Sequence, residues 1–305
     1  MKRPNTFVIG APKCGTTTLL SWLGQHPQAF VSPEKEPHFF YDLYGKTLPE
    51  EDYLALFSAA GDKHKVLAEG SVWYLYAGVA AEILEYNPQA RFVVCLRNPV
   101  DMALSLHAQT LVNRVAYEAT TRFEDAWALS EQRLAGQGAG LYRSSWNTAL
   151  WAYKHSCRVG TQLEALFNAV PRELVHVIVL EDLRDHSRAT WDQLLSFLSL
   201  DPFDEVAFTL QNRAARPRSM RLHQVMVNLG RLKKSLGIGR SFGLFAGLYG
   251  KNVIEADYRR PDDAFIREME AEFAPEVDTL ERLLGRDLSC WRTHRYTQGA
   301  TKEST

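Results

Sequence analysis

The chain of 305 residues is 46% hydrophobic and 23% charged, and its formal net charge is −1. This composition is ordinary for a soluble globular protein, and the sequence contains no low-complexity tract and no repeat. No stretch approaches the ~18 apolar residues of a membrane span, no signal peptide is expected, and the four cysteines lack metal-site spacing, so we expect a cytoplasmic protein without a bound metal.

Short apolar runs that are typical of buried strands alternate along the chain with amphipathic segments that are typical of helices. The predicted strands cover residues 6–10, 65–71, 90–97 and 173–183, and the predicted helices cover 16–24, 99–112, 147–170, 189–200 and 274–291. Asn98 suits the N-cap of the helix predicted at 99–112, and Gly285 is a predicted C-cap. The alternation favours an α/β fold of three layers with a central parallel sheet, which we expect to form one domain over residues 1–305.

The segment GAPKCGTTTLL (10–20) joins the first predicted strand to the first predicted helix. Gly10 and Gly15 permit backbone conformations that other residues avoid, and the amides of a helix N-terminus favour an anion. The segment differs from the nucleotide-binding pattern G-x-x-x-x-G-K-[ST], in which the lysine follows the second glycine, because Lys13 comes before Gly15. The pattern predicts a loop for phosphate or sulfate, and a tight turn with incidental threonines is the alternative.

A second anion site is predicted where the third strand ends. Arg97 follows the apolar run, and Ser105 lies about two helical turns into the next helix, so both point to the same side. An arginine and a hydroxyl can grip a phosphate together, although a surface salt bridge is the alternative for Arg97. Ligands of such sheets bind beyond the carboxyl ends of the strands, so the loop, Arg97 and the pair Glu69 and Ser71 should meet at one edge.

The window 206–254 contains nine basic residues and no acidic residue, which leaves 26 basic residues against all 36 acidic ones elsewhere. A basic segment on an acidic body suggests an anionic partner, and a solvated basic surface is the alternative. Its second half, 230–251, mixes apolar, basic and glycine residues. We expect a flap there that covers the acceptor and favours an amphiphilic or membrane-surface contact, with a packed hairpin as the alternative.

Together these motifs resemble the sulfotransferase family. GAPKCGTTTLL (10–20) resembles the 5′-phosphosulfate loop, and VVCLRNPVDMALSLHAQ (93–109) resembles the 3′-phosphate motif. SPEKEPHFF (32–40) is similar to a segment of the carbohydrate and heparan sulfate branch, and LERLLGRDLSCW (280–291) is similar to the end of bacterial members. The resemblance implies a three-layer fold and transfer of a sulfuryl group from 3′-phosphoadenosine 5′-phosphosulfate, with adenosine 3′,5′-bisphosphate as the product.

The resemblance also implies roles for single residues. Lys13 meets the negative charge that develops on the leaving oxygen, and the donor is held by the loop, the 3′-phosphate motif and a late basic segment. The residues expected to bind the donor are Pro12, Lys13, Cys14, Gly15, Thr16, Thr17, Thr18, Arg97, Ser105, Arg216 and Arg218. The two late arginines depart from the family's glycine-rich spelling, and neither a metal nor a nucleic acid is implied.

The acceptor hydroxyl needs a base. By resemblance to the carbohydrate branch the base is Glu36, with His38 as the other candidate, and a polar loop without a catalytic role is the alternative. Lys35, Glu69, Ser71 and Trp73 are expected to contact the acceptor, although aromatic residues such as Trp73 also serve as core. The acceptor expected is a hydroxyl on a glycan, glycolipid or glycosylated natural product.

Two other functions compete with this prediction. A P-loop kinase would also use a phosphate-binding loop, but it needs the lysine after the second glycine. A non-catalytic nucleotide-binding protein would be expected to lack Lys13 or the carboxylate, and this chain keeps both.

Overall fold

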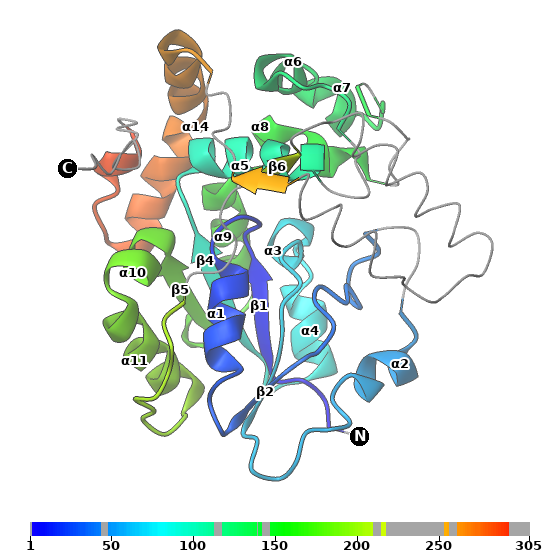
Figure 1. Cartoon of the computed structure of the whole chain (residues 1–305), viewed down its shortest axis with the longest axis vertical. Coiled ribbons are helices and arrows are strands. Elements are labelled where there is room, and N and C mark those ends of the chain that lie inside the picture. Colours follow the sequence, from blue (N-terminus) through cyan, green and yellow to red (C-terminus); the bar gives the residue numbers. More distant parts are fainter. Residues whose placement is uncertain are drawn as a thin grey trace.

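The computed structural model describes residues 2–43, 48–112, 118–138, 140–141, 147–209 and 261–292. For Val112 and for the strands 215–217 and 253–255 it describes the backbone alone. The elements in this part of the chain are arranged as strands that alternate with helices (Figure 1).

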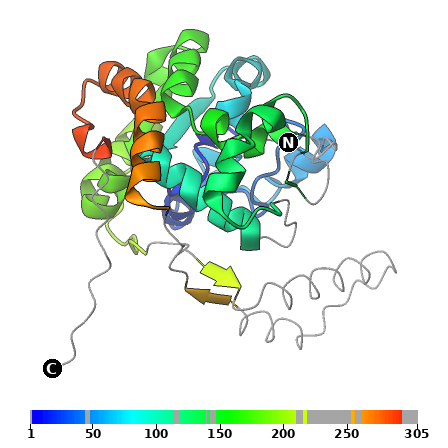
Figure 2. The same cartoon turned by 90° about the horizontal axis from the view of Figure 1, so that it is seen from above.

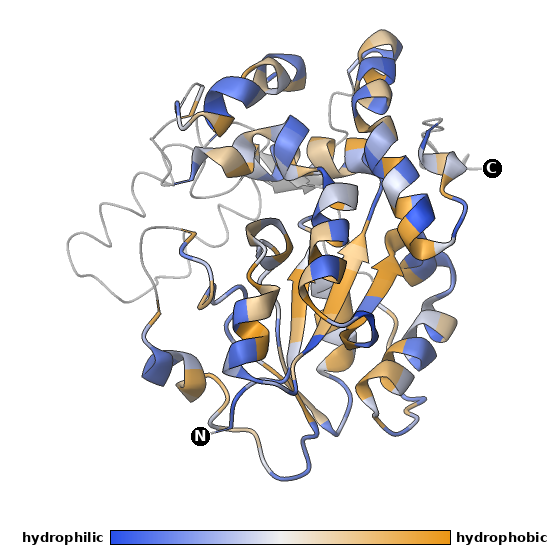
Figure 3. Cartoon of the chain, turned by 180° about the vertical axis from the view of Figure 1, so that it is seen from behind, coloured by the Kyte–Doolittle hydropathy of each residue, from blue (hydrophilic) through white to orange (hydrophobic). Residues whose placement is uncertain are grey.

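A parallel sheet of five strands forms the centre, in the order β2-β3-β1-β4-β5. The strands are β1 (Thr6–Gly10), β2 (Ala29–Val31), β3 (Val66–Glu69), β4 (Arg91–Leu96) and β5 (Val175–Val179). All five residues of β1 are buried, and the hydrophobic colouring runs along the strands in Figure 3. A sheet buried on both faces explains why these segments are apolar runs rather than alternating patterns.

Helices cover both faces of the sheet. The helices α1 (Thr16–Leu23) and α11 (Ser187–Leu198) lie on one side. His26, which follows α1, contacts Trp191 of α11, with ring centroids 6.1 Å apart. The helices α4 (Ala80–Tyr86) and α9 (Val159–Ala169) lie on the other side, in front of the strands in Figure 3. The long helix α14 (Asp263–Leu284) packs on α9 and on α5 (Pro99–Val112). The α/β fold with a central parallel sheet is therefore confirmed.

Shorter elements complete the described part of the chain. They are α2 (Glu50–Ala55), α3 (Tyr74–Ala77), α6 (Phe123–Ala128), α7 (Ser130–Leu134), η1 (Thr148–Trp151), α8 (Tyr153–Ser156), η2 (Arg172–Leu174), α10 (Leu180–Asp185) and η3 (Ser289–Trp291). The strands β6 (Ala215–Pro217) and β7 (Val253–Glu255) pair antiparallel, side by side in Figure 2. β6 lies within the acid-free window and β7 at its end, and β6 lies against α5.

Two predicted elements in the middle of the chain and the last predicted helix differ from the structure. The helix predicted at 147–170 is divided into η1, α8 and α9, because Ala152 and Arg158 have ψ angles of 76° and 64°, which are not helical. The strand predicted at 173–183 ends at Val179, where α10 begins with two acidic residues in its first turn, a charge that favours a helix start.

The last helix begins much earlier than predicted. Asp262 is its N-cap, with a carboxylate oxygen that accepts the Phe265 amide at 2.8 Å, and the helix continues through Pro275. Two other predictions are confirmed. Asn98 accepts the Val100 amide at 2.9 Å as the cap of α5, and Gly285 ends α14 in a left-handed conformation with φ 59°.

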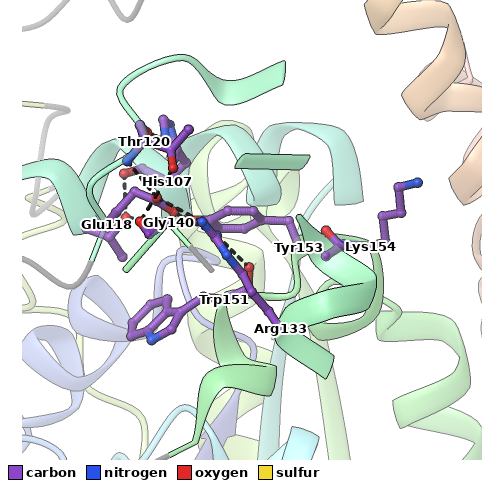
Figure 4. Close-up of polar contacts among 10 residues, drawn as sticks. His107, Glu118, Thr120, Arg133, Gly140, Trp151, Tyr153 and Lys154 are labelled. Carbon is purple, nitrogen blue, oxygen red and sulfur yellow. Dashed lines mark hydrogen bonds and ion pairs between the residues drawn. The ribbon is translucent and has the colours of Figure 1, made fainter. Parts of the chain in front are cut away.

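A buried polar network joins α5 to the short helices above the sheet (Figure 4). The Arg133 guanidinium on α7 donates two hydrogen bonds to the Glu118 carboxylate, at 2.8 and 3.0 Å, and a third to the Trp151 carbonyl. Tyr153 on α8 donates to the same carboxylate at 2.9 Å. His107 on α5 contacts the Thr120 carbonyl at 2.8 Å. The network therefore fixes α7 and α8 relative to α5.

Candidate active site

Two glycines shape the loop between β1 and α1. Gly10 has φ 148° and Gly15 has φ 87°, values in the region that favours glycine. A Cβ atom on Gly10 would meet the Val72 carbonyl oxygen at 2.7 Å, and one on Gly15 would meet Leu183 at 2.8 Å. Gly15 is the N-cap of α1, so the first amides of this helix open toward the loop without partners inside the helix.

Lys13 lies inside this loop in a left-handed conformation with φ 66°. Burial lowers the pKa of Lys13 to about 8, the charges of Arg97 and Lys35 lower it as well, and the charge of Glu36 raises it. Side chains from two other segments, the end of β4 and the segment with Glu36, therefore act on one ammonium group. Three cations close to one carboxylate make the site attractive to an anion.

The other predicted loop residues differ in their exposure. Pro12, Cys14, Thr16 and Thr18 are buried, and Thr17 is half-buried. The Cys14 thiol donates to the Pro12 carbonyl at 3.4 Å, and burial raises the pKa of Cys14 well above its ordinary value. This geometry gives Pro12 and Cys14 a structural part in the loop, and their contact with the donor stays a prediction.

Arg97 lies beside the loop, at the carboxyl end of β4. Its guanidinium is 3.5 Å from the Lys13 carbonyl oxygen and 3.6 Å from the Asp101 carboxylate. Ser105 is half-buried on α5, and the backbone of Arg216 lies in β6, which packs against α5. Arg97 is thus brought next to Lys13 as expected, whereas Arg218 and the segment 230–251 lie outside the described residues.

The segment with Glu36 faces the loop. The Glu36 carboxylate lies 3.4 Å from the His38 imidazole and 3.7 Å from the Lys35 ammonium. Burial alone would raise the pKa of Glu36, but the hydrogen bond from His38 and the charge of Lys35 outweigh burial and lower the pKa below its ordinary value. Glu36 is therefore ionised at neutral pH. His38 is buried and Lys35 is exposed.

Glu69 and Ser71 lie under that segment rather than at the surface. Glu69 is 0% exposed and Ser71 is 1% exposed. The Glu69 carboxylate accepts hydrogen bonds from the Tyr53 and Ser71 hydroxyls, each at 3.0 Å, and Ser71 accepts the His38 amide at 3.2 Å. This geometry favours support of the segment over the direct acceptor contact that the sequence predicts for these two residues.

Trp73 belongs to an aromatic group at the same side. It is 5% exposed and packs edge-to-face on Tyr76 and Trp151, with ring centroids at 5.9 and 6.2 Å. Tyr76 and Trp151 are half-buried, so they keep more accessible surface than Trp73. Trp151 comes from η1, far along the chain, and nothing in its local sequence pattern distinguishes it from a core tryptophan.

A comparison with protein-family models matches residues 3–206 to the Sulfotransferase domain. The matched part carries the loop with Lys13, the Glu36 segment, Arg97 and Ser105. The chain belongs to the sulfotransferase domain family.

Known sulfotransferases resemble this one over different lengths. Carbohydrate sulfotransferase 15 of Homo sapiens is 24% identical over 266 residues, which cover 72% of this chain and 47% of that protein. Heparan sulfate glucosamine 3-O-sulfotransferase 6 of Homo sapiens is 31% identical over 108 residues, which cover 35% of this chain and 31% of that protein. The chain thus spans about half the length of the first of these relatives.

A solved structure extends the similarity to nearly the whole chain. The sulfotransferase from Alicyclobacillus acidocaldarius superposes with a TM-score of 0.65 and 27% identity, covering 96% of this chain and 100% of that one. The resemblance to carbohydrate, heparan sulfate and bacterial sulfotransferases is therefore confirmed.

Two further observations describe this sulfotransferase. No helix in the described ranges has both the length and the apolar character needed to cross a membrane. Within the same ranges, no group of three or more His, Cys, Asp or Glu side chains comes together as metal ligands.

The sequence did not reveal Tyr53, which supports Glu69 from α2. It also gave no signal for the contact between Tyr41 and Asn147, which joins the Glu36 side to the segment before η1. Both contacts connect residues that are distant in the chain, so only the folded structure could show them.

Proposed function

We propose that this sulfotransferase moves a sulfuryl group from 3′-phosphoadenosine 5′-phosphosulfate to an acceptor hydroxyl on a glycan or a related glycosylated molecule. The observation that carries the proposal is the convergence at the loop, where the Arg97 guanidinium lies 3.5 Å from the Lys13 carbonyl oxygen. The Lys35–Glu36 pair, 3.7 Å apart, also acts on the Lys13 ammonium. Cations for an anionic donor and a carboxylate for an acceptor proton therefore act at one place.

The loop supplies the donor side of the reaction. The first amides of α1 can donate hydrogen bonds to the 5′-phosphosulfate, and the Lys13 ammonium adds a positive charge beside it. As the bond between sulfur and the bridging oxygen breaks, negative charge grows on the 5′-phosphate, and Lys13 stabilises that charge. Arg97 and Ser105 supply a charged fork and a hydroxyl for the 3′-phosphate.

Glu36 supplies the acceptor side. The acceptor oxygen forms the new bond to sulfur and gives its proton to a base in reach of the hydroxyl. Glu36 fits this role because its carboxylate is ionised at neutral pH and can accept a proton. His38, at 3.4 Å from Glu36, is the other candidate base, and a comparison of Glu36→Gln with His38→Ala separates the two.

The class of acceptor is supported by two observations. The relatives are named for action on carbohydrate and on heparan sulfate glucosamine. In addition, Tyr76 and Trp151 present half-buried rings around Trp73, two residues after Ser71, and aromatic faces are amphipathic surfaces that suit a sugar ring.

The test is a transfer assay with purified protein and mass spectrometry. The donor is incubated with heparan sulfate-type oligosaccharides and simple glycosides, with ATP and Mg²⁺ as the control donor. We expect one sulfuryl group to be added to a sugar hydroxyl with the sulfated donor alone. Phosphorylation of the same acceptors with ATP, or no transfer to any of them, would refute the proposal.

A further inference from the structure

The turn that carries Glu36 and His38 has an unusual backbone. Glu36 has φ 56° and His38 has φ 52°, and side-chain-bearing residues rarely adopt this left-handed region. Glu36 also precedes Pro37, and a residue before proline favours an extended conformation instead. A turn of this kind persists only where the surrounding structure holds it in place.

Two backbone amides in and just after this turn donate hydrogen bonds to side-chain hydroxyls of another segment. The His38 amide donates to the Ser71 hydroxyl at 3.2 Å, and the Phe40 amide donates to the Tyr74 hydroxyl at 3.1 Å. Ser71 and Tyr74 both belong to the segment that follows β3. The turn is thus tied to the end of a central strand rather than to its own neighbours in the chain.

A buried carboxylate fixes the hydroxyl that receives the His38 amide. The Ser71 hydroxyl donates to Glu69 at 3.0 Å, and the Tyr53 hydroxyl donates to the other carboxylate oxygen at 3.0 Å. A serine oxygen has one proton to give. As long as that proton points to Glu69, a lone pair of the same oxygen is available to the His38 amide.

The ring of Tyr53 adds a second contact with the turn. It stacks on Phe39 with centroids 4.2 Å apart and an interplanar angle of 5°, and it is 0% exposed. One tyrosine from α2 therefore contacts the turn through its ring and the carboxylate under the turn through its hydroxyl.

We propose that Tyr53, Glu69 and Ser71, which we term the buried anchor, are positioning residues that hold the Glu36–His38 turn so that the Glu36 carboxylate faces Lys13. The consequence for catalysis depends on the function proposed above. The anchor itself is a property of the folded chain and can be tested without turnover.

The two hydrogen bonds that Glu69 accepts, from Tyr53 and Ser71, are consistent with this role. Burial raises the pKa of Glu69 to about 7, and the hydroxyls of Ser71, Tyr53 and Tyr74 lower it against that trend. A buried carboxylate is costly unless hydrogen bonds compensate it, so these hydroxyls and the carboxylate depend on one another.

The first experiment measures hydrogen exchange of the turn. Ser71→Ala, Glu69→Gln and Tyr53→Phe are compared with Tyr86→Phe, whose ring lies in the same aromatic cluster, 5.3 Å from Phe40. We expect the His38 amide to exchange about tenfold faster in Ser71→Ala and Glu69→Gln and at the wild-type rate in the control. Unchanged protection of the His38 amide in Ser71→Ala and Glu69→Gln would overturn the proposal.

The second experiment measures turnover with donor binding as the check on folding. Each anchor variant should bind adenosine 3′,5′-bisphosphate with the wild-type affinity while kcat falls by about 10- to 100-fold, the size expected for a base displaced by about 1 Å. In a Glu36→Gln background the same substitutions should cause no further loss, because the anchor acts through Glu36.

The outcomes separate the anchor from the proposed reaction. Faster exchange without a change in kcat, or an equal loss of kcat in the Glu36→Gln background, would reject the positioning role. If the wild-type protein transfers no sulfuryl group to any acceptor, the proposed function fails, while the exchange measurement still decides whether the anchor holds the turn.

Discussion

Lys13 is the residue at which the chemistry of the site meets its electrostatics. Its ammonium is half-buried in the loop, close to two other cations and one carboxylate. The pKa of about 8 means that the side chain carries its charge at neutral pH but loses it within the range in which enzymes are commonly assayed. The charge of this residue is therefore open to a direct test.

Substitution of Lys13 should change both the rate of transfer and its dependence on pH. Lys13→Ala should lower kcat by on the order of 10²–10³, because one donor to the developing charge is lost. In the wild type, kcat/KM for the donor should fall as the pH rises through about 8, where free Lys13 deprotonates. In Lys13→Arg this fall should vanish, since a guanidinium stays charged. The same fall in the arginine variant would assign it to another group.

Arg97 should determine affinity for the 3′-phosphate. Arg97→Ala should weaken binding of adenosine 3′,5′-bisphosphate by about 10- to 100-fold, the value of a charged hydrogen bond, and affinity for adenosine 5′-monophosphate should change little. Arg122→Ala is the matched control, because its side chain is exposed and pairs with Glu124 on α6. Calorimetry that finds equal losses for both nucleotides would remove Arg97 from the 3′-phosphate site.

At the scale of elements, the site depends on helices that are joined to one another by buried polar groups. The Arg133–Glu118 pair is the strongest example, because neither side chain exceeds 1% exposure. A buried charge is stable only with its partner, and Tyr153 and the Thr120 amide satisfy the rest of the Glu118 carboxylate. The network fixes the positions of α7 and α8 relative to α5, the helix that carries Ser105.

Loss of the Glu118 charge should therefore destabilise the protein. Glu118→Gln should lower the free energy of unfolding by about 3 kcal/mol, because Arg133 is left charged and buried. Glu131→Gln breaks an ion pair with His155 whose carboxylate is 67% exposed, and it should cost at most about 1 kcal/mol. Denaturant unfolding compares the two. Equal effects would show that the buried pair contributes no more than a surface pair.

The elements that the sequence predicted well are those with strong local signals. The strands β1 and β4 and the helix α5 agree with their predicted ranges, since apolar runs and the Asn98 cap are local features. The helix predicted at 147–170 was wrong, because an amphipathic pattern persists across the breaks at Ala152 and Arg158. The helix predicted at 274–291 missed the first part of α14, which begins at Asp263 and continues through Pro275.

At the scale of the whole molecule, the parallel sheet explains why distant segments converge. β1, β3 and β4 are neighbours in the sheet, so the loop, the Glu69 segment and Arg97 had to emerge at one edge, as predicted. The left-handed turn at Glu36 and the burial of Glu69 could not be predicted, because both depend on contacts between residues distant in the chain. The contact of Tyr53 with Glu69 is of the same kind.

The most direct test of the account is a rapid-quench single turnover with ³⁵S-labelled 3′-phosphoadenosine 5′-phosphosulfate bound to the protein before a glycan acceptor is added. The account predicts that the wild type transfers the label to the glycan. Glu36→Gln should bind the donor equally well but transfer the label more slowly, by on the order of 10²–10⁴, because the acceptor proton has no base. Transfer by Glu36→Gln at the wild-type rate, or a wild type that does not bind this donor, would contradict it.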